Sequence, residues 1–422
     1  MLLLAAVILF FSRAVPGQES LPEAADRKNE RAYTTTVSEH FDGLAPDPFG
    51  AWLLQLEKEA IEKGVDRKTF ASAFQGVAPL PRVIELDRSQ AEFIQPFWMY
   101  LSSRVSTKRI RDGRILLRKH SNILDSIQRK YGVQSRFLVA FWGLETNFGQ
   151  NLGSFRVVAA LATLAFDERR SEFFRSELLD ALFILDDGHV MADNMLGSWA
   201  GAMGQTQFMP STFMTYSVDE DGDGRKDIWS SLPDAFGSAA NFLAKLGWNS
   251  NQTWGREIKL PRGFDLKNIG FSVNKDLGEW QLLGIRRING RDLPQVQIEG
   301  SVILPAGIKG PAFLVYANFR TIMKWNRSSL YAISVGHLAD RIAGGGPLES
   351  PRQQELPLAR VDIIKLQDRL RSLGFDPGES DGRIGPRTKG AIVQFQAAKG
   401  LPPDGYADKN LLDVITTDTA FP

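Results

Sequence analysis

The sequence predicts an α+β protein that is mainly helical. A large helical domain with a small strand-containing subdomain is followed by a small three-helix domain at the C-terminus. Apolar residues recur at helical spacing through most of residues 49–342. Between residues 257 and 319, Gly, Pro and Asn separate short runs rich in Val and Ile, which is typical of strands. Residues 343–360 are rich in Gly and Pro, and amphipathic patterns resume after them.

Length and composition limit the class of protein. The chain has 422 residues, and a prior of about 150 residues per domain gives two or three domains. Lys and Arg number 50 against 49 Asp and Glu, a net charge of +1. Because counterion release from nucleic acid needs a basic surface, this balance disfavours a general nucleic-acid binder. The absence of cysteine excludes disulfides, thiolate metal sites, cysteine nucleophiles and a lipid anchor on an N-terminal cysteine.

The N-terminus is typical of an export signal. Leu2–Phe11 is a continuous apolar run of ten residues, shorter than the roughly 20 residues of a membrane-spanning helix. Small residues follow at positions 14–17, although no Lys or Arg precedes the run. We expect residues 1–17 to be a signal peptide and residues 18–46 a polar linker. A buried strand is the alternative. The product is expected to be periplasmic and soluble, with no membrane anchor after cleavage.

The remaining chain divides at one boundary. We expect one large domain over residues 47–342, a linker over 343–360 and a small domain over 361–416. The runs Val296–Val302 and Phe313–Tyr316 are predicted to be strands. In the small domain, Gly382 and Gly405 each follow an Asp and precede a helix-like run, which indicates a duplicated helix–turn unit.

Glu145 is the candidate catalytic acid. It ends the apolar, aromatic run Phe137–Leu144, which is predicted to be helical, so its carboxyl group is expected to be partly desolvated. Desolvation disfavours the charged form and raises the pKa. A carboxylic acid that is protonated near neutral pH can donate a proton to a glycosidic oxygen. From the spacing alone, a helix cap or a partner for an arginine is an equally good interpretation.

A second motif, Gly197–Pro210, combines small residues with neutral polar side chains. Small residues let the backbone approach a ligand closely, and Ser198, Gln205 and Gln207 offer groups of the kind that orient sugars. The pattern predicts a glycan-binding loop, with a tight turn between helices as the structural alternative.

A third motif matches the start of an EF-hand calcium loop. Carboxylates fall at positions 1, 3 and 5, Gly at 6 and Asp at 9, but position 12 is Ser230 and not the usual Glu. We expect a structural Ca²⁺ site of reduced affinity, with an acidic surface turn as the alternative, and Asp234 is a candidate late ligand. The expected ligands are Asp219, Asp221, Asp223, Arg225 and Asp227.

These segments together resemble the B-type lytic murein transglycosylases, glycoside hydrolase family 103. They occur in the family's order over about 290 residues. The tail resembles the small three-helix peptidoglycan-binding domain through its Leu-Gln, Phe-Gln and two Asp-Gly pairs. The segments that carry the first resemblance are Phe97–Leu101 with Arg104–Ser106, FWGLETNFG at 141–149, SWAGAMGQTQFMPST at 198–212, DGDG at 221–224 with Asp227–Trp229, and Trp325–Tyr331.

The resemblance implies a lysozyme-like helical catalytic domain that cleaves the β-1,4 bond between N-acetylmuramic acid and N-acetylglucosamine without hydrolysis, leaving 1,6-anhydro ends. Glu145 would protonate the leaving oxygen and then act as base on the muramic O6 hydroxyl. The substrate's N-acetyl group would stabilise charge at C1, and no second acid is found beside Glu145 in the chain. No cofactor is required, and the expected partners are peptidoglycan glycan strands and no nucleic acid. Whether other cell-wall enzymes take part stays open.

The resemblance also implies substrate contacts. Ser198, Gln207 and Asn326 match glycan-contacting positions, Tyr100 and Tyr331 match groove positions, and Arg169 and Arg170 match a basic pair near the peptide stem. The chain departs from the family at Phe242 and Trp325, where tyrosine is common. A hydrolytic muramidase, which usually uses a second carboxylate, and a non-catalytic wall-binding protein are the alternative functions.

Overall fold

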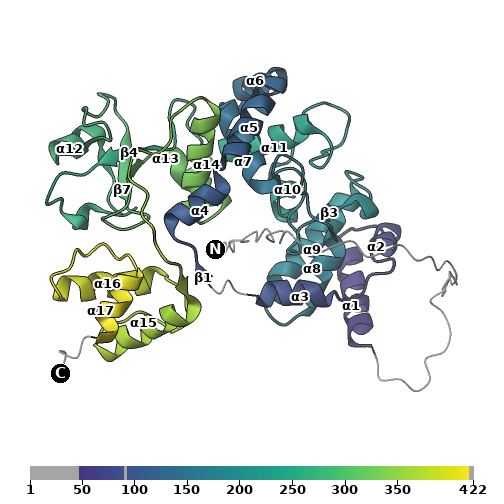
Figure 1. Cartoon of the computed structure of the whole chain (residues 1–422). Coiled ribbons are helices and arrows are strands. Elements are labelled where there is room, and N and C mark those ends of the chain that lie inside the picture. Colours follow the sequence, from purple (N-terminus) through teal and green to yellow (C-terminus); the bar gives the residue numbers. More distant parts are fainter. Residues whose placement is uncertain (1–46, 90–92, 418–422) are drawn as a thin grey trace, which may run out of the picture.

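The computed structural model of the protein describes residues 47–89 and 93–417. This part of the chain is mainly helical and contains one five-stranded sheet (Figure 1), which confirms the predicted fold class. The expected signal peptide at 1–17 and the expected linker at 18–46 both lie outside the described residues. No helix in the described part is long and apolar enough to cross a membrane.

One helical layer is built around α8 (Val157–Phe166). Nine of its ten residues are buried, because the run VVAALATLAF offers no polar face. Its neighbours share a single apolar cluster with it. They are α1 (Pro48–Glu62), α2 (Arg67–Ala73), α3 (Pro81–Arg88), α9 (Ser171–Asp186) and α10 (Pro210–Tyr216).

A second layer surrounds α7 (Ser135–Thr146), in which every residue but Arg136 is buried. The predicted apolar helix therefore forms, and it lies at the centre of the core. The helices around it are α4 (Phe97–Arg104), α5 (Thr107–Lys119), α6 (Ser121–Tyr131), α11 (Leu232–Lys245), α13 (Ala317–Trp325) and α14 (Ser329–Ile342).

The strand-containing subdomain lies between α11 and α13 in the chain. Its sheet has the antiparallel order β5-β7-β8-β4-β6 and packs on α12 (Leu277–Leu282) through Trp280. The second predicted strand forms almost as expected, whereas the first begins at Glu299, since exposed Val296 lies outside the sheet. The strands are β4 (Gly255–Lys259), β5 (Lys275–Asp276), β6 (Arg286–Arg287), β7 (Glu299–Ile303) and β8 (Ala312–Val315).

Four further short strands form two pairs, and two 3₁₀ turns complete the described elements before α15. The pair β2–β3 anchors the segment before α8 to the segment after α9. They are β1 (Phe93–Ile94), β2 (Phe155–Arg156), β3 (Leu196–Gly197), β9 (Leu358–Ala359), η1 (Ala192–Asn194) and η2 (Leu266–Asn268).

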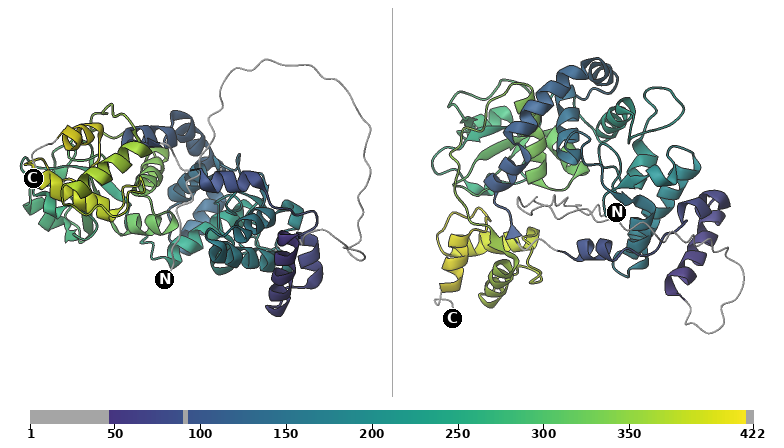
Figure 2. Two further views of the ribbon diagram at one scale, coloured as in Figure 1. Left: turned by 90° about the horizontal axis from the view of Figure 1, so that it is seen from below. Right: turned by 45° about the vertical axis from the view of Figure 1, so that its right-hand side comes forward.

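The C-terminal helices have their own apolar cluster. They are α15 (Arg360–Ser372), α16 (Pro386–Ala398) and α17 (Lys409–Thr417). Figures 1 and 2 show them beside the strand-containing subdomain, with α1 and α2 at the other end of the molecule.

The segment that joins these helices to α14 is attached along its length. Glu257 accepts hydrogen bonds from the backbone N–H groups of Glu349 (2.7 Å) and Ser350 (2.9 Å). Further on, β9 pairs antiparallel with β1, the strand that leads into α4. The segment that leads to the C-terminal helices is therefore held on the large domain at several points.

Candidate active site

Glu145 is the second-last residue of α7, where the chain leaves the core. Asn147, Phe148 and Gly149 follow with φ values of 52°, 62° and 79°, three consecutive left-handed residues that end the helix sharply. Glu145 itself is only 6% exposed. Burial raises the pKa of Glu145 to about 7, against hydrogen bonds from Tyr331 and Trp325 and the charge of Arg104, which lower it. The carboxyl group is thus about half protonated at neutral pH, as its sequence context predicts.

Two donors meet on one oxygen of this carboxyl group. The Tyr331 hydroxyl donates to Oε1, and the Trp325 indole N–H donates to the same atom over 3.1 Å. Oε2 accepts no hydrogen bond from the described residues. Because Oε1 is already occupied by two donors, the proton of the acid form belongs on Oε2.

Few charged side chains act on Glu145. Arg104 is the only charged side chain of the described chain that shifts the pKa of Glu145. Tyr100, one turn before Arg104 on α4, has its ring 5.3 Å from that guanidinium, and burial raises the pKa of its phenol. No carboxylate among the described residues acts on Glu145. An inverting hydrolase would need such a second carboxylate to activate water.

Trp325 is fixed by aromatic neighbours. Its ring centroid lies 4.4 Å from that of Phe141, 5.1 Å from Phe242 and 5.4 Å from Phe208. Phe242, which lacks the family's hydroxyl, thus serves as packing for the residue that contacts the acid. Sequence reasoning noted Trp325 only as a departure from the family pattern and did not include it, or Arg104, in the site.

The loop after β3 is joined to α7 through Gln205. Its Oε1 accepts from the Trp142 indole (2.7 Å), and its Nε2 donates to the Trp229 carbonyl (2.8 Å). Both ends of the amide are therefore used inside the protein, contrary to the expectation that it orients sugar. Gly204 has a φ of +67° and a Cβ there would lie 2.6 Å from the Ile228 carbonyl, so only glycine fits.

The other loop candidates keep free polar atoms. Ser198 accepts from the Ala202 N–H (3.0 Å), which leaves its hydroxyl proton to donate. Gln207 has a left-handed φ of 54°, and its Nε2 donates to two backbone carbonyls, Leu152 and Gly204. Asn326, directly after Trp325, has a buried Oδ1 with no hydrogen-bond partner in the described part of the chain.

The basic pair is engaged elsewhere. Arg169 donates to the Asp87 carbonyl (3.0 Å) and lies 3.2 Å from its carboxylate. The Arg170 guanidinium stacks on Phe173 and Phe174, 4.8 Å from each ring centroid. No contact between either arginine and Glu145 is present among the described residues.

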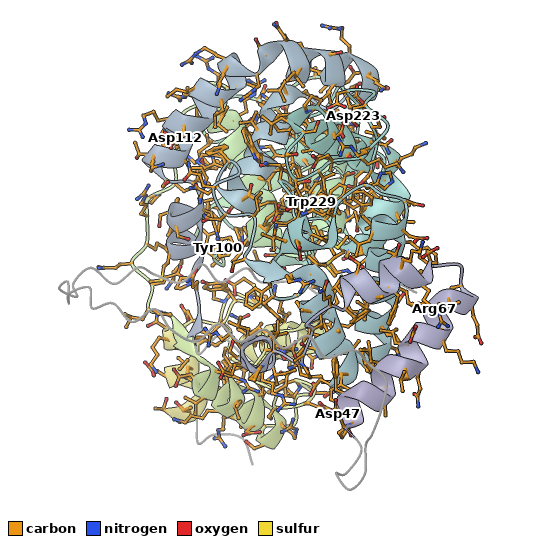
Figure 3. The ribbon with its side chains drawn as sticks, turned by 90° about the vertical axis from the view of Figure 1, so that its right-hand side faces the viewer. Asp47, Arg67, Tyr100, Asp112, Asp223 and Trp229 are labelled. Atoms are coloured by element: carbon orange, nitrogen blue, oxygen red, sulfur yellow. The ribbon has the colours of Figure 1, made fainter. Side chains whose placement is uncertain are left out.

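The acidic loop forms a separate cluster. Carboxylate oxygens of Asp219, Asp221 and Asp223 lie within 4.8 Å of one another, a donor set that suits a hard cation such as Ca²⁺. Asp227 lies outside this cluster and accepts from the Trp229 and Ser230 N–H groups. Figure 3 shows Asp223 well away from Tyr100, so an ion here would be structural.

Two further residues of this loop differ from simple ligands. The Arg225 guanidinium lies 3.3 Å from the Asp223 carboxylate. Asp234 accepts from the Glu220 (2.7 Å) and Asp227 (2.8 Å) N–H groups, so it holds the loop backbone and does not serve as the late ligand that its position suggested.

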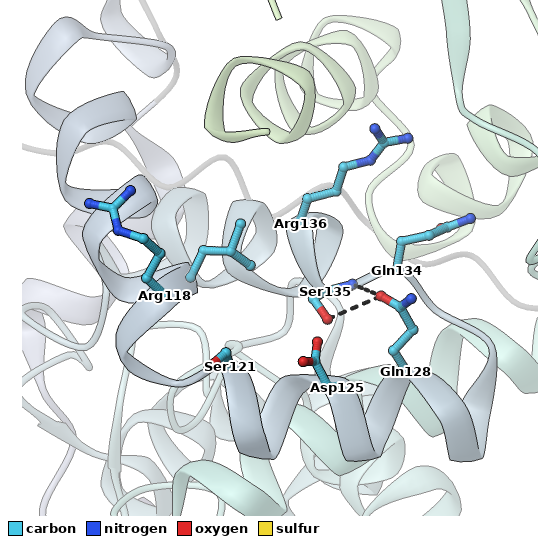
Figure 4. A pocket seen from close by; sticks show the side chains of 8 residues that line it. Arg118, Ser121, Asp125, Gln128, Gln134, Ser135 and Arg136 are labelled. Atoms are coloured by element: carbon cyan, nitrogen blue, oxygen red, sulfur yellow. Dashed lines mark hydrogen bonds between the residues drawn. The ribbon is translucent and has the colours of Figure 1, made fainter. Parts of the chain in front are cut away.

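A pocket of about 510 Å³ opens at the other end of α7 (Figure 4). Gln128 accepts there from the Ser135 backbone N–H (2.8 Å) and hydroxyl (3.1 Å), which caps the helix. Ten residues at a rise of about 1.5 Å place this pocket roughly 15 Å from Glu145. It is therefore separate from the acid.

A mainly helical core that holds a buried carboxyl group with a raised pKa, on which no carboxylate of the described residues acts, is the arrangement expected of an enzyme that cleaves glycans with one acid. Residues 48–340 match the transglycosylase SLT domain family, and residues 360–415 match a peptidoglycan binding domain family. The chain belongs to the lytic transglycosylases, and its fold is the lysozyme-like fold of that family.

Known proteins of this kind cover much of the chain. The membrane-bound lytic murein transglycosylase B of Escherichia coli is 30% identical over 303 residues, 68% of this chain and 81% of that protein. The crystal structure of SltB3 from Pseudomonas aeruginosa with NAG-anhNAM-pentapeptide is similar with a TM-score of 0.85, at 46% identity over 87% of this chain and 99% of that one. The Escherichia coli transglycosylase Slt35 in complex with calcium has a TM-score of 0.60, at 29% identity over 69% and 92%.

Proposed function

We propose that the chain cleaves the β-1,4 bond between N-acetylmuramic acid and N-acetylglucosamine in peptidoglycan, without water, and leaves 1,6-anhydro ends. The observation that carries this proposal is Glu145, a buried acid with a pKa raised to about 7, on which no carboxylate of the described residues acts. The complex of SltB3 with NAG-anhNAM-pentapeptide supports it, since anhydro-muramic acid is the product of such a reaction.

The proposed reaction uses one carboxyl group twice, first as acid and then as base. Glu145 donates the proton on Oε2 to the leaving O4 of N-acetylglucosamine as the C1–O4 bond breaks. The substrate's N-acetyl oxygen stabilises the positive charge at C1. The O6 hydroxyl of the same muramic acid then attacks C1 and returns its proton to Glu145. The acid is regenerated, and no water is consumed.

We propose that the substrate is held by residues around this acid. Ser198, Gln207 and the unpartnered Oδ1 of Asn326 would bind sugar hydroxyl and amide groups. Tyr100 and Tyr331 would line the groove, and Arg169 and Arg170 would contact the peptide stem, in exchange for part of their present contacts.

The test is mass spectrometry of products from purified sacculi. The wild type is expected to release anhydromuramoyl products, and Glu145→Gln to release at least about a hundredfold fewer, as expected when a general acid is removed. Glu145→Asp is the matched control for charge. Reducing-end products would assign a hydrolase, and no product from folded wild type would assign a wall-binding protein.

We also propose two finer features. The three-aspartate cluster would bind Ca²⁺ with help from the Arg225 carbonyl and Asp227, and the ion would stabilise the loop without entering the chemistry. Slt35 with calcium supports this. Residues 1–17 would direct the protein to the periplasm, which cell fractionation with and without these residues tests.

A further inference from the structure

The C-terminal domain contains the same hydrogen-bonded turn twice. In the first turn (residues 381–383), Gln367 donates to Asp381 Oδ1 (3.2 Å) and accepts from the Gly382 N–H (3.0 Å). In the second turn (residues 404–406), Gln396 donates to Asp404 Oδ1 (2.9 Å) and accepts from the Gly405 N–H (2.9 Å).

The turns also match at their third residue. The backbone N–H of Arg383 donates to Asp381 Oδ1 (2.9 Å), and that of Tyr406 donates to Asp404 Oδ1 (3.0 Å). In both turns, Oδ1 of the aspartate is therefore used inside the domain. Oδ2 and the side chain of the third residue are left to contact something else.

The second turn is occupied by two earlier segments of the same chain, one in the strand-containing subdomain and one in the segment that joins α14 to α15. Asp404 Oδ2 accepts from the backbone N–H of Ile308 over 2.8 Å. The Tyr406 hydroxyl contacts the Glu355 carboxylate. The fit is close, since a Cβ on Gly307 would lie 2.8 Å from Asp404 Oδ2. A turn of this type thus binds a peptide N–H and a neighbouring carboxylate.

The first turn presents the corresponding groups to solvent. Asp381 is exposed, and its Oδ2 accepts no hydrogen bond from any described residue. Arg383 stands where the second turn has Tyr406, is exposed, and its guanidinium contacts no carboxylate of the described chain. A guanidinium is a stronger partner for a carboxylate than a phenol, because it donates two charge-assisted hydrogen bonds.

We propose that the first turn binds the acidic peptide stem of peptidoglycan, with a peptide N–H on Asp381 Oδ2 and a stem carboxylate on Arg383. This inference rests on the proposed function for the identity of the peptide. It assigns the two turns different tasks, since the first binds the wall and the second docks the domain on the enzyme.

The experiment measures binding of a stem pentapeptide, fluorescently labelled at its N-terminus, to the full chain by anisotropy. Arg383→Gln is expected to weaken binding about three- to tenfold, the range of an exposed ion pair with a hydrogen bond. Asp381→Asn keeps Oδ1 for the turn and replaces only the free acceptor, so it is expected to weaken binding as well. Arg383→Lys is expected to recover part of the affinity.

The matched control is Lys365→Gln, which removes an exposed cation of the same domain. Equal affinity of Arg383→Gln and Lys365→Gln, with unchanged thermal stability, would overturn the inference. Retention of the chain on sacculi should fall with Arg383→Gln and should be low for both proteins on glycan strands stripped of peptide by an amidase. Undiminished retention on stripped strands would assign the domain to glycan instead.

The two proposals fail separately. Release of anhydro products from peptide-free glycan strands depends on Glu145 and is expected to be unchanged by Arg383→Gln. If that release occurs but peptide affinity is the same with and without Arg383, the inference is wrong and the proposed reaction is unaffected. If Arg383 governs peptide affinity but no anhydro product forms, the inference stands and the proposed reaction is wrong.

Discussion

The indole N–H of Trp325 lies 3.1 Å from Oε1 of Glu145, the same oxygen that receives the Tyr331 hydroxyl. Both donors lower the pKa of Glu145, while burial raises it further than they lower it. The pKa near 7 is therefore a balance between desolvation and two hydrogen bonds, and each hydrogen bond can be removed alone.

Tyr331→Phe and Trp325→Phe should move the pH dependence of the reaction. Glu145 must be protonated to act as acid, so kcat/KM of the wild type is expected to fall as pH rises through about 7. Each substitution removes a donor that stabilises the carboxylate, raises the pKa further and shifts the falling limb to higher pH. A pH–rate profile of soluble glycan cleavage measures this, and an unmoved limb in both variants would contradict it. Tyr216→Phe, on a ring outside this contact, is the control.

Glu145→Gln should change stability in a pH-dependent way. The folded-state pKa of about 7 lies above the ordinary value of 4.5 for a glutamate, so the stability contributed by this group is fully present below pH 4.5 and is lost as pH rises through 7. Gln does not titrate. Relative to the wild type, Glu145→Gln should therefore gain about 3 kcal/mol between pH 4.5 and pH 8, as an upper figure. Urea unfolding of both proteins at the two pH values checks this, and a constant difference would count against it.

Calcium should stabilise the protein through the three-aspartate cluster. At an ion concentration a hundred times the Kd, the free energy of unfolding rises by about 2.7 kcal/mol. Asp221→Asn removes one charge from the cluster and should reduce this gain. Thermal melts with calcium and with a chelator measure it, with Asp265→Asn, outside the cluster, as control. Identical melting temperatures of the wild type with calcium and with chelator would show that the cluster binds no calcium.

Truncation should separate anchoring from support of the fold. A chain that ends at residue 342 loses β9, the partner of β1, and also Arg352, whose guanidinium lies 5.9 Å from the Trp98 ring on α4. A chain that ends at residue 359 keeps both. We expect both chains to lose retention on sacculi, and the shorter one to melt at a lower temperature. Equal melting temperatures would show that the joining segment gives α4 no support.

The helix that carries the acid was predictable because its signal is local. The run before Glu145 is apolar on all sides, which indicates a buried helix, and burial in turn predicts the raised pKa. The contacts that tune the acid were not predictable in this way. Trp325 and Glu145 are 180 residues apart in the chain and meet only because α14 packs on α7 and α13 packs on α14.

Two expectations about polar side chains show the same limit. Gln205 has the chemistry of a ligand-binding group, but its amide bonds to Trp142 and Trp229. The substrate contact of Arg169 stays a prediction, since its present partner is Asp87, 82 residues earlier in the chain. Residue type predicts what a side chain can bind. Only the fold determines whether a partner within the protein has already taken its place.

The docking of the C-terminal domain has a consequence for how the enzyme samples its polymer. Ile308 and β1 contact that domain at two places, so the structure sets the separation between the proposed attachment point, the first turn, and the proposed acid, Glu145. An enzyme joined to its binding domain by a flexible linker could reach any bond within the length of that linker. With the domain docked as in this structure, the attached enzyme would cut only bonds at a set distance from the peptide stem that it binds.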